Sequence, residues 1–324
     1  MARPPRPRRT RLPPPHRGRR PLVRRPLPGP RPRHPLTRPP AAPPPQNHRP
    51  PAPRPATRDR DHEPARPPRT PARLRHAAHQ LLHFGLLQAR SCAFAVALVA
   101  GIAVSGLLPA LPVARYDLVL LYGLLLAVLA RRLGWDRPGD TRVLLGCHAI
   151  GLLFELVKVR LGSWSYPEEA LTKIAGVPLY GGFLYAAVGS YVCRAWHLLR
   201  LELDGYRPRT MAALAAAVYL NFFTHHWLPD ARWVLAALLL AATTGTWVRY
   251  TVGDTHHRMP LALAFALIGF FLWIAENAAT YAGAWSYPDQ LDGWQPVSLA
   301  KFGAWSLLIS VTFVVAARTR PRPA

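Results

Sequence analysis

The chain has 324 residues, half of them hydrophobic, and a formal net charge of +25 at pH 7. Residues 1–75 contain 25 of its 37 prolines and 21 arginines against three acidic residues, so they carry +18 of that charge and leave +7 for the rest. This division excludes one uniform soluble fold, and three scattered cysteines exclude a disulfide framework or a cysteine zinc site.

Residues 1–75 are expected to form a disordered Pro/Arg-rich tail, because they bury too little apolar surface to offset the entropy of ordering. The arginines would attract anionic lipid headgroups. No aromatic residues stand between them, so specific nucleic-acid binding is not expected. The alternative is an unstructured extension translated from an upstream start, without a function of its own. A cleaved signal peptide is not expected, because the charged stretch is too long.

Residues 76–324 are predicted to be an all-α membrane domain with eight spans, because about 20 apolar residues in a helix cross a bilayer. The expected spans are 92–111, 116–133, 142–161, 177–199, 210–228, 231–249, 260–281 and 296–317. Polar residues weaken the fifth, so a seven-span arrangement with that segment in the membrane interface stays open. The predicted halves cover about 90–200 and 208–318.

The loop charges predict the orientation of these spans. With a cytoplasmic N-terminus, fourteen arginines fall in inside segments and six lysines or arginines fall outside. Short loops rich in Lys and Arg stay in the cytoplasm. We therefore expect a multi-pass protein of the bacterial plasma membrane with both termini in the cytoplasm.

A four-residue motif, Trp-Ser-Tyr-Pro, occurs at residues 164–167 and again at 285–288. A glutamate precedes each copy by nine residues, Glu155 in the first and Glu276 in the second. Matching spacings favour a duplication, here two parallel repeats of four helices each. An acidic residue within an apolar run is costly and marks a functional candidate.

The two glutamates are the predicted catalytic residues, since carboxyl groups in apolar surroundings suit proton transfer. Lys301 is the expected partner of Glu276, whereas Lys158 could neutralise Glu155 on the same helix. Polar and aromatic residues at the same depth would bind substrate, namely Lys158, Trp164, Tyr166, Tyr180, Tyr185, Asn221, His225, Asn277, Tyr281, Trp285, Tyr287 and Lys301.

No cofactor or metal is expected. Adjacent residues such as His225 and His226 point about 100° apart on a helix, so they cannot easily share one ion. Walker and Rossmann motifs are also missing from the sequence.

The first motif and its surroundings resemble domain-of-unknown-function family 817. The resemblance rests on Phe154-Glu155, Lys158, residues 162–167, residues 177–183, Tyr185-Ala186, residues 188–191, Glu276-Asn277 and residues 285–288. It covers about residues 80–317 and implies an uncharacterised bacterial multi-pass membrane protein without an assigned reaction.

Residues 162–167 and 176–179 are also similar to a stretch of the membrane-embedded lycopene cyclases. Those enzymes have a Pro-x-Glu-Glu pair for acid chemistry, where this chain has Tyr180 and Gly181. An acid role would then fall to Glu155 or Glu276. We expect acid/base chemistry on a lipid-like or isoprenoid substrate, with a proton-coupled small-molecule transporter or a non-catalytic scaffold as alternatives.

Overall fold

The chain is mostly helical in a computed structural model, which describes residues 70–109 and 112–320. The helices within these ranges are α1 (Thr70–Ser91), α2 (Ala93–Ser105), α3 (Arg115–Arg132), α4 (Pro138–Arg160), α5 (Gly181–Leu198), α6 (Pro208–Thr224), α7 (Arg232–Thr243), α8 (Leu261–Tyr281) and α9 (Ala300–Arg318). The expected tail lies largely outside the described residues. The part that is described, from Thr70 on, already belongs to α1.

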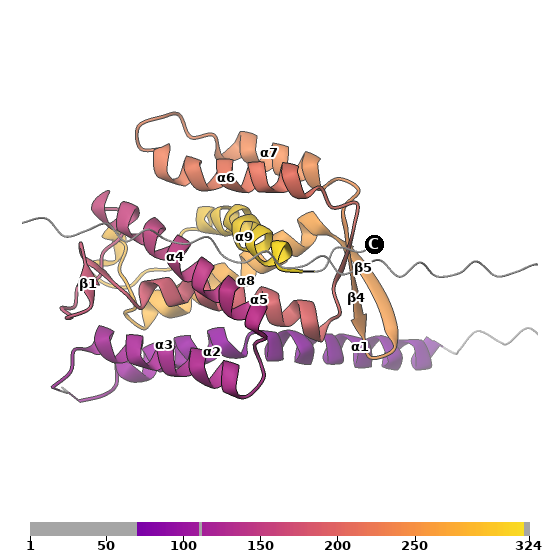
Figure 1. Ribbon diagram of the computed structural model, residues 1–324, viewed down its shortest axis with the longest axis horizontal. Coiled ribbons are helices and arrows are strands. Elements are labelled where there is room, and N and C mark those ends of the chain that lie inside the picture. The colour runs from indigo at the N-terminus through magenta and orange to yellow at the C-terminus, as the bar shows by residue number, and fades with distance from the viewer. Residues whose placement is uncertain (1–69, 110–111, 321–324) are drawn as a thin grey trace, which may run out of the picture. The chain divides into compact units, whose positions relative to one another are not determined.

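Two small antiparallel sheets interrupt the helices, so the expected all-helical fold is wrong in detail. β1 (Lys173–Ile174) pairs with β2 (Val177–Pro178). β3 (Glu202–Asp204), β4 (Trp247–Val252) and β5 (Thr255–Pro260) form a second sheet in that order. The two sheets lie at opposite ends of the helices (Figure 1).

The expected eight spans are not supported by the described residues. By length and composition, α8 and α9 suffice to cross a membrane, and a third crossing is added if α1 and α2, bent by 60° at their junction, act as one span. The 12 residues of α7 reach only about 18 Å, too short for a bilayer core of ~30 Å. Charged residues at both ends of α3 lower its hydropathy.

The expected sixth span, 231–249, combines two elements of different kinds. Its helix ends at Thr243, and the chain then enters the β4–β5 hairpin. Gly253, with a φ of +59°, lies at the turn of this hairpin, where glycine adopts a left-handed conformation without strain. The regular repeat of two four-helix halves is therefore not supported either, because a sheet stands between α7 and α8.

Two helix pairs form the centre of the fold: α4 packs on α5, and α8 packs on α9. Small residues allow the close approach, as is common between helices in membranes. A Cβ added at Gly182 of α5 would lie 2.7 Å from Nδ1 of His148, and one added at Gly269 of α8 would lie 2.7 Å from the backbone nitrogen of Ser306. These contacts fix the two pairs at short range.

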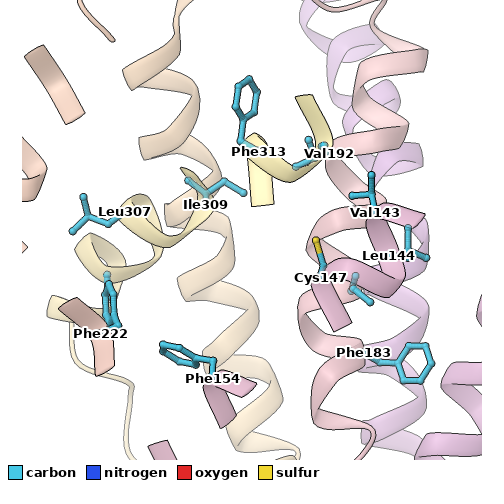
Figure 2. Packing of buried hydrophobic residues seen from close by; sticks show 14 of the residues in the cluster. Val143, Leu144, Cys147, Phe154, Phe183, Val192, Phe222, Leu307, Ile309 and Phe313 are labelled. Atoms are coloured by element: carbon cyan, nitrogen blue, oxygen red, sulfur yellow. The ribbon is translucent and has the colours of Figure 1, made fainter. Parts of the chain in front are cut away.

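The hydrophobic core runs between these pairs and α6. Figure 2 shows Val143 and Cys147 of α4 on one side and Ile309 of α9 on the other. Phe154 of α4 approaches Phe222 of α6 with ring centroids 6.0 Å apart. These two aromatic residues also form part of the cavity described below.

A polar cluster joins the other ends of these helices. Asp140, near the start of α4, is fully buried and accepts from Nη2 of Arg320 at 2.7 Å. It also lies 3.0 Å from Nε2 of His197 at the end of α5. This cluster therefore ties the chain after α9 to the α4–α5 pair.

Candidate functional site

The two copies of the motif follow helices that end in the same way. Gly162 follows α4 with a φ of +68°, and Gly283 follows α8 with a φ of +71°. In both loops the residue after this glycine donates its N–H back five residues, Ser163 to Lys158 O and Ala284 to Ala279 O, each at 3.0 Å. Such a left-handed glycine and backbone hydrogen bond terminate a helix and reverse the chain. Each motif is thereby turned back toward its own glutamate.

The two motif loops also pair with each other. Ser165 and Ser286 form an antiparallel bridge in which each backbone N–H donates to the other's carbonyl oxygen at 3.0 Å. Near this bridge, the hydroxyl of Tyr180 donates to the carbonyl oxygen of Ala284. The pairing brings residues 121 positions apart into register and places the two glutamates on the same side of the loops.

Glu155 of α4 is 3% exposed and accepts three hydrogen bonds from aromatic side chains. Nε1 of Trp164 and the hydroxyl of Tyr166 donate to its Oε2 at 2.7 and 2.8 Å. The hydroxyl of Tyr185, on α5, donates to Oε1 at 2.8 Å. The three donors together fix the position and orientation of this carboxyl group.

Glu276 of α8 is 5% exposed and accepts two such bonds. The hydroxyl of Tyr287 donates to Oε1 at 2.5 Å, and Nε1 of Trp305 on α9 donates to Oε2 at 2.8 Å. Tyr287 stands eleven residues after its glutamate, as Tyr166 does in the first copy. Trp285 makes no such bond, and Trp305 supplies the indole donor in its place.

The two motif tyrosines act as donors because their phenols stay protonated. Burial, followed by the charge of Glu155, raises the pKa of Tyr166 well above its usual value of 10. Burial and Glu276 do the same to the pKa of Tyr287. Neither phenol ionises near neutral pH, so each continues to hold its carboxylate.

Both glutamates line one cavity of about 240 Å³. Its walls come from α4 to α9 and the motif loops, and Phe154 and Phe222 are visible in Figure 2. The predicted residues that line it are Glu155, Lys158, Trp164, Tyr185, His225, Glu276, Trp285, Tyr287 and Lys301. The sequence reasoning missed Ser163, Leu184, Arg232, Ser298, Trp305 and Leu308, among others.

The two lysines do not pair with the glutamates as expected. Nζ of Lys301 lies 4.2 Å from the ring centroid of Tyr287 and 5.5 Å from that of Trp164. Nζ of Lys158, a residue 4% exposed, lies 3.1 Å from Nε2 of His226. Neither ammonium has a carboxylate oxygen within 4.0 Å in the described part of the chain. The aromatic donors occupy the carboxylates instead.

Five other predicted residues lie outside the cavity wall. Tyr166 and Tyr180 are buried behind it and hold Glu155 and the second motif loop. Asn221 bonds Asp230, which orders the turn between α6 and α7. Asn277 accepts from the backbone nitrogen of Val297, and Tyr281 is 74% exposed. These residues position loops or face outward.

The cavity residues that were not predicted differ in whether the sequence contains a signal for them. Trp305 is followed by no repeated motif, so nothing in the sequence connects it to Glu276. Arg232 stands beside Asp230, with which it forms an ion pair at 2.8 Å.

In residues 70–109 and 112–320, no three His, Cys, Asp or Glu side chains gather so as to hold a metal ion.

Comparison with known proteins agrees with the resemblance of the motif regions to domain-of-unknown-function family 817. The family model "Protein of unknown function (DUF817)" matches residues 80–313. The chain is 48% identical over 243 residues to "Uncharacterized protein YoaT" of Bacillus subtilis (strain 168), covering 74% of this chain and 92% of that protein. No solved structure matches the chain. The match over most of its length shows that the chain belongs to the DUF817 family.

Proposed function

We propose that this chain is a membrane protein whose cavity binds a small lipid-like or isoprenoid substrate and exchanges a proton with it. The observation that carries the proposal is the meeting of Glu155 and Glu276, from separate helix pairs, on one cavity of about 240 Å³. Buried carboxyl groups suit proton transfer. The surrounding indole and phenol rings suit a substrate that develops positive charge.

Apolar side chains on the outer faces of the helices support the membrane location. Trp233 of α7 is 80% exposed, Phe271 of α8 is 64% exposed and Leu121 of α3 is 59% exposed. Soluble proteins rarely expose so many large apolar side chains, whereas a bilayer would cover them. Together with α8 and α9, they support insertion into the plasma membrane. We further propose that the chain crosses the membrane several times and has both termini in the cytoplasm.

The hydrogen bonds suggest different roles for the two carboxyl groups. Glu276 accepts one hydrogen bond at each carboxyl oxygen, so either oxygen keeps a position for a proton that can be donated to the substrate. That transfer leaves Glu276 as a carboxylate and a positive charge on the substrate. Glu155, held by three donors, stabilises that charge or accepts the proton that the substrate then releases.

The variant Glu276→Gln tests this assignment with little change of shape. The amide oxygen can accept from Trp305, and the hydroxyl of Tyr287 can reverse to accept from the amide N–H. Cells that express the wild type or the variant at equal membrane levels are compared by lipid and metabolite profiling. We expect the product made by the wild type to be lost in the variant.

The matched control is Glu202→Gln, the same substitution at an exposed position of β3. It should give the wild-type profile. An unchanged product in Glu276→Gln cells would end the proton-transfer proposal. A variant that fails to reach the membrane while every profile stays the same would favour the non-catalytic scaffold.

A proton-coupled carrier is the second candidate, because the cavity lies between the α4–α5 and α8–α9 pairs, whose relative movement could change access to it. Purified protein in vesicles with an imposed pH gradient separates the two. Net movement of solute that follows the gradient and is lost in Glu276→Gln, without chemical change of the solute, would establish the carrier.

A further inference from the structure

Three cationic and two acidic side chains line the cavity, and its lysines are not in contact with its glutamates. Lys158 comes from α4, Arg232 from α7 and Lys301 from α9, and all three line the wall. Arg232 is paired with Asp230 at 2.8 Å, whereas neither lysine has a carboxylate oxygen within 4.0 Å in the described chain. Buried ammonium groups are costly without a counter-ion.

The glutamates cannot readily take over that role. Their oxygens accept five hydrogen bonds from indole and phenol groups at 2.5 to 2.8 Å. These donors hold both carboxyl groups in place, and in this arrangement neither carboxyl group contacts Lys158 or Lys301. The lysines are thus kept available for an anion that enters from outside.

The start of α9 adds to the attraction for an anion. Its first turn contains no acidic residue, and Oγ of Ser298 accepts from the N–H of Ala300 at 3.3 Å. Ser298 and Ala300 at this end line the same cavity as the buried Lys158. The helix dipole favours negative charge there. Helix end and ammonium groups act on one site.

A second, smaller cavity borders the first. Both share the walls formed by Phe154, Tyr185, Trp305 and Leu308. The second, of about 30 Å³, is otherwise lined almost entirely by apolar side chains, among them the Cys147 and Ile309 of Figure 2. A volume of about 240 Å³ is below the range of sites that enclose a drug-sized ligand, so it suits a head group better than a whole lipid.

We infer that this cavity holds the phosphate head of an amphipathic phosphomonoester through Lys158 and Lys301, with the apolar chain along the second cavity. Two lysines on separate helices, neither of them paired with a carboxylate among the described residues, suit a doubly charged phosphate head better than a singly charged carboxylate. This assignment rests on the proposed function, since it names the substrate class of the same cavity.

Binding of octyl phosphate to the purified full chain in a neutral detergent tests the inference. Tryptophan fluorescence is a suitable signal, because Trp164, Trp285 and Trp305 line the cavity. We expect octyl phosphate to bind at least about tenfold more tightly than octanol, octanoate or inorganic phosphate, since each lacks one of the recognised parts. Equal binding of octanol removes the ionic site, equal binding of octanoate removes the phosphate assignment, and equal binding of inorganic phosphate removes the apolar chain.

Lysine variants locate the binding. Lys158→Gln and Lys301→Gln should each weaken octyl phosphate binding by about tenfold or more, and Lys301→Arg should retain most of it. Arg209→Gln, which removes an exposed charge on α6, is the matched control. The arginines of residues 1–69 are the same in every variant, so binding to them cancels. Unchanged affinity in both folded glutamine variants would overturn the site.

The variant Glu276→Gln separates this inference from the proton-transfer proposal. It should bind octyl phosphate at least as tightly as the wild type, because it removes a negative charge from the wall. Tight binding with no loss of product would end the proton-transfer role and leave the phosphate site. Loss of product with equal binding of octyl phosphate and octanol would do the reverse.

Discussion

The two motif copies hold their glutamates by similar means but to different degrees. In both, a left-handed glycine ends the helix and a tyrosine eleven residues after the glutamate returns to its carboxyl group. Glu155 accepts two donors from its own loop and one from α5, whereas Glu276 accepts one from its own loop and one from α9. The difference teaches that two copies of one sequence motif can hold equivalent carboxyl groups with different numbers of donors, because neighbouring helices supply the remainder.

Removal of each carboxyl group tests this difference most strongly. Glu155→Ala leaves three buried donors unpaired and should lower the free energy of unfolding by about 4 kcal/mol, against about 2–3 kcal/mol for the two donors left by Glu276→Ala. Denaturant unfolding in mixed micelles measures both. Equal losses would show that the third donor to Glu155 contributes nothing.

Glycine substitutions test how closely each helix pair must pack. A Cβ at Gly269 of α8 would meet the backbone of Ser306, with 2.8 Å to its Cα, so α9 itself must move. At Gly151 of α4 it would meet Cγ and Cδ2 of Tyr185 and lie 2.7 Å from its Cβ, so the whole side chain must move although no backbone atom is among these contacts. We expect Gly269→Ala to cost about 2–3 kcal/mol and Gly151→Ala about 1–2 kcal/mol.

Thermal unfolding of both variants shows which of the two substitutions destabilises the protein more. Gly303→Ala on α9 is the matched control, because an added Cβ there would meet nothing within 4 Å. A larger loss at Gly151 than at Gly269 would mean that Tyr185 is more tightly fixed than the α8–α9 contact.

Removing a single phenol sharpens the comparison further. Tyr166→Phe leaves Glu155 with two donors, and Tyr287→Phe leaves Glu276 with one. Each should cost about 1.5–3 kcal/mol, as expected for a hydrogen bond to a charged group. Only Tyr287→Phe should also shift the pH dependence of product formation, since it acts on the proton-carrying group.

The exposed Tyr281, which contacts neither glutamate, provides the control Tyr281→Phe. A shift of the same size in the pH profile of Tyr166→Phe would assign the exchangeable proton to Glu155 instead.

The sequence predicted a common site for Glu155 and Glu276 because their spacing to the motif is the same. It predicted the partner of Lys301 wrongly, since charge suggests a carboxylate, whereas this ammonium faces the rings of Tyr287 and Trp164. Ring faces and indole N–H groups have no formal charge, so no count of ionic residues detects them.

The sequence predicted the positions of the helices far better than it predicted how many of them are long and apolar enough to span a membrane. The expected segment 260–281 agrees with α8 to one residue, because its apolar run is unbroken. The hairpin at 247–260 was readable from Gly253-Asp254 between alternating strands, yet the apolar residues before it were assigned to a helix. A long apolar stretch therefore predicts a helix correctly, but the hairpin next to it is easily assigned to the same helix.

The smallest expected effect concerns His226, which lies beside Lys158 at the cavity's edge. Burial, followed by the charges of Lys158 and His225, lowers the pKa of His226. The unfolded chain then binds the proton more readily, so stability present above the ordinary histidine pKa of about 6.5 declines as the pH falls through it toward the lower folded value. Solvent exposure keeps this decline small.

His226→Gln should therefore reduce the loss of thermal stability between pH 7.5 and pH 5.5, read as the difference between the two unfolding midpoints. His76→Gln, on an exposed face of α1 away from Lys158, is the matched control. The sign is the decisive result: a wild type that gains stability on acidification through His226 would mean that a carboxylate, and not Lys158, dominates its surroundings. In that case the cavity's edge would be acidic, and the phosphate head would lose its electrostatic basis.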